Sequence, residues 1–231
     1  MCVGDIVKNL SLLIKPASSL CNFDCIYCFY HDVAQHRQVQ NFGLMSDDVT
    51  TALIRQAVAI DDNSLITFAF QGGEPTLAGL DYFEGFTQQV SNMKKPNQII
   101  HYSIQTNGYL IDQQWCKLFS EHRFLVGLSL DGFKENHDQF RLTRQNQPTF
   151  DRVMETTKLL RKNQIDFNIL TVLTSELARR PKELYEFYKE NDFRYVQLIP
   201  CFLGLDQSDD LFTLKPIEFA YFYKEFYTVW H

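Results

Sequence analysis

Six short apolar runs, each followed by a polar turn and a longer segment with helical spacing, constrain the fold of this chain more than any other feature. The runs are rich in β-branched and aromatic residues and cover residues 10–15, 65–70, 99–105, 125–130, 167–173 and 195–199. The helical segments cover residues 46–59, 81–93, 112–121, 149–163 and 181–190, and a further one runs from residue 216 to the end. Strands that alternate with helices in this way predict a parallel sheet with helices outside it.

The predicted strands are almost unbroken in apolar character, which indicates a sheet that is covered on both faces. We therefore expect an α/β protein built as a partial (β/α)6 TIM-like barrel, with a doubly wound open sheet as the alternative. Ser46 and Asp112 are suited to cap two of the helices, and Pro181 and Pro216 are suited to the first turns of two others. In either fold, chemistry is expected at the C-terminal ends of the strands.

Composition limits the partners that this chain can have. The chain has 231 residues, 45 % of them hydrophobic, and we expect a single domain over residues 1–231. Its formal net charge is −6 and no basic run is longer than a pair, which argues against nucleic acid as a partner. No segment approaches the about 20 apolar residues that span a bilayer, and the first residues do not resemble a targeting signal. We expect a cytoplasmic protein whose thiols stay reduced.

Unusual residues follow the predicted strands. The first strand is followed by "CNFDCIYCFY", the second by "QGGEPTL", the third by "TNG", the fourth by "SLDG" and the sixth by "PCF". Because the carboxyl ends of parallel strands meet at one edge of a sheet, these motifs are expected to lie together on one rim.

Three of the six cysteines lie within eight residues, at Cys21, Cys25 and Cys28. Clustered thiols in a reducing compartment favour metal or redox chemistry over disulfides. The spacing alone leaves three interpretations open: a three-thiolate iron–sulfur cluster, a zinc site completed by His31, and cysteines without a metal. The remaining cysteines lack metal-like spacing; they are Cys2, Cys116 and Cys201.

The C-x3-C-x-aromatic-C pattern, followed by "GGEP", resembles the radical S-adenosylmethionine superfamily. A narrower resemblance rests on "KPASSLCNFDCIYCFY", "QGGEPTL", "TNG", "SLDG" with "HDQFR", and "IPC". Together these motifs are similar to the core domain of anaerobic sulfatase-maturating enzymes and related peptide-modifying members. The resemblance covers about residues 12–202, most of the chain.

The resemblance implies a radical S-adenosylmethionine core that uses two cofactors. Cys21, Cys25 and Cys28 would hold a [4Fe-4S] cluster whose fourth iron is chelated by S-adenosylmethionine. An electron from the cluster would cleave the sulfonium, and the 5′-deoxyadenosyl radical would take a hydrogen atom from the substrate. The protein would orient and shield these groups.

The resemblance also implies a set of cofactor contacts. Gly72 and Gly73 would let the backbone approach the ligand closely, and Glu74 would offer its carboxylate to the methionine ammonium. Ser129 and Arg141 match family positions at the ribose and carboxylate end of the cofactor, and the forked guanidinium of Arg141 suits a carboxylate.

Four further residues match family positions near the cofactor or the substrate. Tyr27 would lie against adenine, and Phe202 would offer its backbone to the same ring. Tyr30 would lie near the cofactor and Gln71 near the substrate, although both also fit ordinary packing. Asn107 fits a simple turn position. No catalytic side chain is assigned by this comparison.

The expected reaction is oxidation of a Cys or Ser side chain in a protein or peptide substrate, such as a sulfatase, to an aldehyde. The electron donor would be a flavodoxin or a ferredoxin. Two alternatives remain open: a peptide-modifying enzyme that forms thioethers or other crosslinks, and a non-catalytic iron–sulfur module. Sulfatase-maturating enzymes carry a further C-terminal region with auxiliary clusters and a proton-accepting aspartate, and we expect these 231 residues to form the core without it.

Overall fold

The computed structural model describes residues 8–205 and 212–230. Six parallel strands form one sheet in the order β1-β3-β4-β5-β7-β8. These strands are β1 (Lys8–Ile14), β3 (Ser64–Phe70), β4 (Ile99–Thr106), β5 (Leu125–Ser129), β7 (Phe167–Leu173) and β8 (Val196–Pro200). Each lies within two residues of the strand predicted for it.

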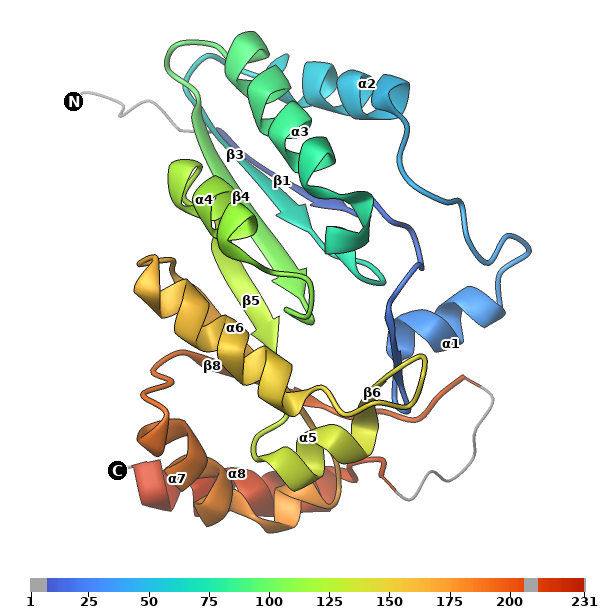
Figure 1. The fold of residues 1–231 in the computed structure, drawn as a ribbon, viewed down its shortest axis with the longest axis vertical. Helices are drawn as coiled ribbons and strands as arrows, with labels where there is room; N and C mark the ends of the chain where they lie inside the picture. The colour runs from blue at the N-terminus through green and yellow to red at the C-terminus, as the bar shows by residue number, and fades with distance from the viewer. Residues whose placement is uncertain (1–7, 206–211, 231) are drawn as a thin grey trace, which may run out of the picture.

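The strand order follows the chain from one edge of the sheet to the other, and β1 and β8 do not pair. A doubly wound sheet reverses its strand order at a switch point, and this sheet does not. The fold is therefore the predicted partial barrel, open between β1 and β8, with helices along its outer face (Figure 1).

The predicted helices are present with small shifts at their ends. They are α2 (Asp47–Val58), α3 (Leu80–Met93), α4 (Gln113–Glu121), α6 (Phe150–Lys162), α7 (Pro181–Glu190) and α8 (Pro216–Trp230). Ser46 caps α2, because its side chain accepts a hydrogen bond from Val49 N at 3.4 Å. Asp112 caps α4 by accepting from Gln114 N and Trp115 N at 2.9 and 3.1 Å.

The core lies between the sheet and the outer helices. Along β3, buried and half-buried residues alternate, and Phe68 and Phe70 point toward α3. The rings of both lie edge-on to Phe86, with centroids 5.1 and 5.0 Å away. The opposite, concave face is only partly covered among the described residues. The expectation of two covered faces was thus wrong for the inner face of this half-barrel.

Several short elements were not predicted. The strands β2 (Phe23–Cys25) and β6 (Arg141–Thr143) form a separate antiparallel pair. The other unpredicted elements are α1 (Phe29–Gln35), α5 (Lys134–Phe140) and the 3-10 turns η1 (Pro75–Ala78) and η2 (Leu177–Arg179). Five of these six elements carry or adjoin the motifs quoted above: β2, β6, α1, α5 and η1.

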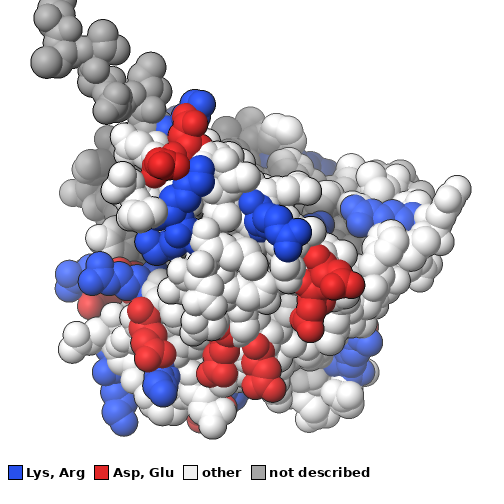
Figure 2. All heavy atoms as spheres, turned by 90° about the horizontal axis from the view of Figure 1, so that it is seen from above, with Lys and Arg blue, Asp and Glu red and all other residues white. Residues whose placement is uncertain are grey.

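The surface carries charges of both signs. On the face shown in Figure 2, Lys and Arg side chains are interspersed with Asp and Glu side chains. Among the described residues, no helix has the length and apolar character needed to cross a membrane.

Candidate active site

The three clustered cysteines lie on the loop that leaves β1 and enters α1. Cys28 caps α1, and its sulfur accepts a hydrogen bond from His31 N at 3.4 Å. The sulfur of Cys21 accepts from Phe23 N, also at 3.4 Å. Two of the three thiols are therefore already oriented by backbone N–H groups, which are donors that favour thiolates.

Cys25 is oriented from a distant part of the chain. In the β2–β6 pair, Cys25 is the cross-strand partner of Arg141, and Arg141 Nη1 lies 4.0 Å from Cys25 Sγ. The pairing is extended on one side by Ile26 N, which donates to Phe140 O at 3.1 Å. The cysteine loop and the "HDQFR" motif, separate in the sequence, thus form one unit.

Asp131, in the "SLDG" motif, holds the two predicted cofactor residues Tyr27 and Arg141. It is fully buried, and its Oδ2 accepts hydrogen bonds from Arg141 Nε at 2.8 Å and from the Tyr27 hydroxyl. Its Oδ1 accepts from Val172 N at 2.9 Å and from Arg141 Nη2 at 3.4 Å. The sequence analysis did not select Asp131. A carboxylate directly after the apolar run "LVGLSL" is the signal that could have identified it.

Burial and nearby charges shift the pKa of Arg141 in opposite directions. Burial lowers the pKa of Arg141, but the charge and hydrogen bond of Asp131, together with Tyr27 and Cys25, outweigh this effect and leave the pKa well above its ordinary value. Burial raises the pKa of Tyr27 well above its ordinary value, so the ring stays a neutral hydrogen-bond donor. The Tyr27 ring packs against Phe140, with centroids 5.6 Å apart, and lies 5.5 Å from the Arg141 guanidinium carbon.

The two glycines of "GGEP" pack against the chain that leads into Cys21. Gly72 has a φ of +118°, and a Cβ on Gly73 would lie 2.1 Å from Leu20 O. Gly73 N donates to Ser18 O at 3.0 Å. In this structure the glycines therefore permit a close approach of two backbone segments. Their expected contact with the cofactor stays a prediction.

The Glu74 side chain is 1 % exposed and accepts four hydrogen bonds from the protein. Oε1 accepts from Thr76 N, Thr76 Oγ1 and Thr106 Oγ1 at 3.0, 2.6 and 2.6 Å, and Oε2 accepts from Asn107 N at 2.7 Å. Burial raises its pKa, and these hydrogen bonds act against that shift. Glu74 thus ties the rim after β3 to the rim after β4, and its expected contact with the methionine ammonium stays a prediction.

Asn107 connects this buried carboxylate with the cysteine loop. Its side-chain amide donates to Asn22 Oδ1 at 2.8 Å and lies 3.9 Å from Cys21 Sγ. Its own Oδ1 accepts from Tyr109 N at 3.0 Å, which is the turn interaction that the sequence suggested. Asn107 therefore has a second role beside Cys21 that sequence analysis missed.

The remaining predicted residues differ in how close they lie to this group. Ser129 is nearly buried at the end of β5. The Tyr30 hydroxyl donates to Gln71 Oε1 at 2.8 Å, so α1 and the end of β3 meet there. Phe202, after β8, is exposed and makes no ring contact with the other described residues.

Two further cysteines are buried at other places in the fold. Cys116 is buried on α4 and Cys201 is buried just after β8, whereas Cys2 lies outside the described residues. Burial raises the pKa of Cys21 to about 11 and that of Cys25 to about 12 in the metal-free protein. The half-buried thiols of Cys21 and Cys25 interact electrostatically with each other and with Arg141, and Cys21 also accepts from a backbone N–H, which makes a donor set suited to a soft metal centre.

The described residues contain no group of three or more His, Cys, Asp or Glu side chains arranged around a single metal ion. His31, the fourth ligand of the zinc alternative, has its ring nitrogen 2.6 Å from the side-chain amide of Gln35. In a cubane cluster each thiolate binds a different iron, so the sulfurs need not converge on one point. The donor set fits such a cluster better than a mononuclear zinc site.

Comparison with known proteins agrees with this geometry. The family model of the radical SAM superfamily matches residues 16–188. A cysteine-type anaerobic sulfatase-maturating enzyme from Clostridium novyi is 39 % identical over 226 residues, covering 97 % of this chain and 60 % of the relative. The enzyme of the same name from Clostridium perfringens is 43 % identical over 224 residues, covering 96 % of this chain and 60 % of the relative.

A solved structure described as "Native anSMEcpe with bound AdoMet and Kp18Cys peptide" superposes with a TM-score of 0.89 at 42 % identity. That alignment covers 96 % of this chain and 60 % of the solved chain, so the sequence spans about three fifths of the length of these relatives. The family model covers most of the sequence, including the cysteine loop and the motifs after β3, β4 and β5. This chain belongs to the radical SAM superfamily.

Proposed function

We propose that this chain is the core of an enzyme that oxidises a cysteine side chain in a protein substrate to an aldehyde, as in sulfatase maturation. The observation that carries this proposal is the contact of the cysteine loop with Arg141, the cross-strand partner of Cys25, and with Asp131, which accepts hydrogen bonds from Arg141 and from Tyr27 of the loop. The printed names of the relatives, cysteine-type sulfatase-maturating enzymes, support the choice of reaction. We also propose a cytoplasmic location, because the cluster loop needs reduced thiols.

Cys21, Cys25 and Cys28 would hold a [4Fe-4S] cluster, and S-adenosylmethionine would bind beside it. When bound, these groups supply an electron that cleaves the sulfonium and a 5′-deoxyadenosyl radical that takes a hydrogen atom from the target side chain. Arg141 would bind the cofactor carboxylate through its remaining donors, and Asp131 would keep the guanidinium in place. Tyr27 would contribute an aromatic face whose tilt is fixed by Phe140.

The proposed cofactor contacts are completed by five further residues: Ser129, Gly72, Gly73, Glu74 and Phe202. Tyr30 is proposed to lie beside the cofactor and Gln71 beside the substrate. The Tyr30 to Gln71 hydrogen bond supports their acting together. The chain spans 60 % of the length of the Clostridium novyi relative, and the substrate and the proton-accepting group are part of the proposal.

Anaerobic reconstitution with iron and sulfide tests the cofactor part of the proposal. We expect charge-transfer absorbance in the visible range and about four irons per chain. Cys25→Ala should lose that absorbance, whereas Cys116→Ala, which removes a buried thiol outside the loop, should keep it. A loop that binds stoichiometric zinc and no iron would contradict the proposal.

The reaction is tested by adding dithionite, S-adenosylmethionine and a peptide with one target residue. We expect 5′-deoxyadenosine, and a peptide whose mass shows conversion of Cys to an aldehyde. A peptide with an internal thioether as its product would favour the crosslinking alternative. A full cluster without any 5′-deoxyadenosine would favour a non-catalytic module.

A further inference from the structure

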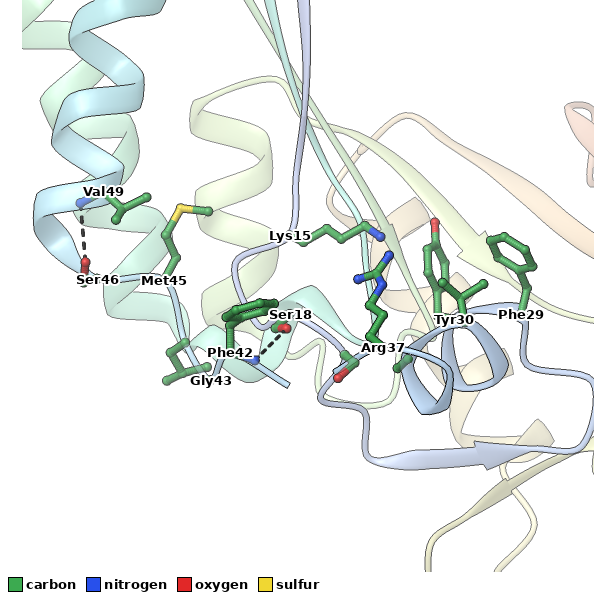
Figure 3. A pocket seen from close by; sticks show the side chains of 14 residues that line it. Lys15, Ser18, Phe29, Tyr30, Arg37, Phe42, Gly43, Met45, Ser46 and Val49 are labelled. Atoms are coloured by element: carbon green, nitrogen blue, oxygen red, sulfur yellow. Dashed lines mark hydrogen bonds between the residues drawn. The ribbon is translucent and has the colours of Figure 1, made fainter. Parts of the chain in front are cut away.

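A pocket of about 550 Å³ lies directly beside the cysteine loop. It is formed by the end of β1, by α1 and by the chain that leads into α2, as Figure 3 shows. Its lining residues are Lys15, Ser18, Ser19, Phe29, Tyr30, Val33, Ala34, Arg37, Phe42, Gly43, Leu44, Met45, Ser46 and Val49. We call the part made by Lys15, Phe29, Arg37, Phe42 and Leu44 the α1 surface.

Both charged side chains of the α1 surface are basic. Lys15 and Arg37 are the charged residues among those lining the pocket, and neither pairs with an acid among the described residues. Their side chains point toward one another beside Tyr30 (Figure 3), and Lys15 Nζ lies 4.7 Å from the centre of the Tyr30 ring. Partial burial, and then the charge of Arg37, lowers the pKa of Lys15. An acidic partner would relieve the repulsion between these two cations.

The same surface exposes large apolar side chains. Phe29 is 66 % exposed, Phe42 is 73 % exposed and Leu44 is also exposed, and all three line the pocket. Large apolar side chains grouped on a surface mark sites of protein contact more often than chance, whereas single ones need no explanation. The segment that presents Phe42 is held in place, because Phe42 N donates to Ser18 Oγ at 3.1 Å and Met45 N donates to Pro16 O at 2.7 Å.

The α1 surface lies next to Cys28, one of the proposed cluster ligands. Phe29 follows Cys28 directly, and Cys28 caps the helix whose other residues line the pocket. Tyr30, two residues after Cys28, lies on the same helix and also lines the pocket. A partner on this surface would therefore lie next to one ligand of the proposed cluster.

We propose that the α1 surface is the docking site for the electron donor, a small redox protein with acidic residues around its redox centre. This inference rests on the proposed function, which needs one electron at the cluster. The donor is oxidised by one electron and the cluster is reduced by one, with no bond made or broken and no proton to place. Basic side chains around apolar ones suit such a partner, because interfaces of electron-transfer proteins are small and depend on charge for steering.

Two variants test this site, Lys15→Met and Arg37→Gln, because each removes the charge and keeps most of the side-chain volume. Arg55→Gln, on the exposed side of α2 and outside the pocket, is the matched control. The probe is an acidic flavodoxin, with the cluster-loaded protein. We expect the Kd for flavodoxin to rise about tenfold in each pocket variant and to stay unchanged in Arg55→Gln.

The rate of cluster reduction, followed by the loss of visible absorbance, gives a second readout. With reduced flavodoxin it should fall in Lys15→Met and Arg37→Gln and lose most of its salt dependence. With dithionite, which needs no docking, all variants should match the original protein. The substitution Arg37→Glu should weaken flavodoxin binding further, and a flavodoxin variant with a lysine in place of a surface acid should recover part of it.

Three results would overturn the proposal. Unchanged flavodoxin binding in both pocket variants would show that the partner docks elsewhere. An equal loss of rate with dithionite would show that the substitutions damage the cluster loop. A raised KM for the peptide with dithionite as reductant would assign the surface to the substrate. Absence of 5′-deoxyadenosine with dithionite in the original protein would instead be a failure of the proposed function.

Discussion

Asp131 and Arg141 form a buried ion pair, with Arg141 Nε 2.8 Å from Asp131 Oδ2 and the aspartate fully buried. The two residues are brought together by the turn after β5 and by the start of β6, and the pair reaches Cys25 through the free side of the guanidinium. The Asp131 carboxylate thus orients both Tyr27, on the cysteine loop, and Arg141, the cross-strand partner of Cys25.

Asp131→Asn should strongly destabilise the fold, because the amide NH2 replaces one of the two carboxylate oxygens and places N–H groups against two of the four donors that now find an acceptor. Removing one partner of a buried pair typically costs about 3–5 kcal/mol. Chemical denaturation of the metal-free protein measures this change. The control is Asp151→Asn, whose exposed pair with Lys134 should contribute under about 1 kcal/mol. Equal stability of the two variants would contradict the structural role given to Asp131.

Gly73→Ala should lower the iron content of the reconstituted protein. The new Cβ would lie 2.1 Å from Leu20 O, so the backbone just before Cys21 must move. Gly85→Ala is the matched control, because Gly85 lies exposed in α3 with no atom within 4 Å of the new Cβ. That change should raise helix stability by up to about 1 kcal/mol. Iron analysis and thermal unfolding measure both effects, and a full cluster in Gly73→Ala would refute the reasoning.

Asn107→Asp should make the reduction potential of the cluster more negative. The aspartate keeps the acceptor for Tyr109 N but removes the N–H donor beside Cys21 Sγ and adds a negative charge. Hydrogen bonds to the sulfurs raise the potential of iron–sulfur clusters, so their loss should shift it on the order of tens of millivolts. A redox titration followed by electron paramagnetic resonance, without S-adenosylmethionine, gives the value. An unchanged or more positive potential would mean that Asn107 serves the turn alone.

The free energy of unfolding of the metal-free protein should decrease as the pH falls from about 6.5 to 4, because the buried His137 side chain resists protonation in the folded state. Burial lowers the pKa of His137 from 6.5 to about 4. Between these values the unfolded chain binds a proton that the folded chain does not, so stability is lost as the pH decreases. Asp131 N donates to Nδ1 at 3.2 Å, and Nε2–H donates to Thr149 Oγ1 at 3.0 Å, which fits the neutral ring.

The matched measurement is the difference in unfolding free energy between the original protein and His137→Gln. At pH 7 the original protein should be more stable, and the gap should shrink by about 2–3 kcal/mol near pH 4.5. A gap that does not change with pH would exclude His137 as the titrating group.

The sequence predicted the six strands and six of the helices because each is long enough to show a period. The run at Phe167–Leu173, for example, matches β7 at both ends. Helix caps could also be predicted from the sequence, because Asp112 accepts hydrogen bonds from the backbone N–H groups two and three residues after it. Local physics determines these features, so a local pattern reveals them.

The parts of the site that depend on distant contacts could not be predicted. The strands Phe23–Cys25 and Arg141–Thr143 are three residues long, which is too short for any alternation to be visible. Glu74 was predicted to contact the cofactor. The hydrogen bonds that its carboxylate accepts from Thr106 and Asn107 depend on how β3 and β4 align, which the sequence does not reveal. An Asp-Gly pair such as Asp131 and Gly132 is typical of a turn, and Gly132 does adopt a positive φ of +70°, so the local pattern does not reveal the buried contacts of Asp131.

The pairing of Cys25 with Arg141 also bears on how the protein acquires its cofactor during synthesis. These partners are 116 residues apart, so β6 is synthesised long after the cysteine loop. Until β6 arrives, the thiols lack the contacts that orient Cys25, and closing so long a loop is slow. Iron and sulfide insertion should therefore follow synthesis of the first four strands of the sheet and of β6, which makes cluster loading a late event in the biogenesis of this protein.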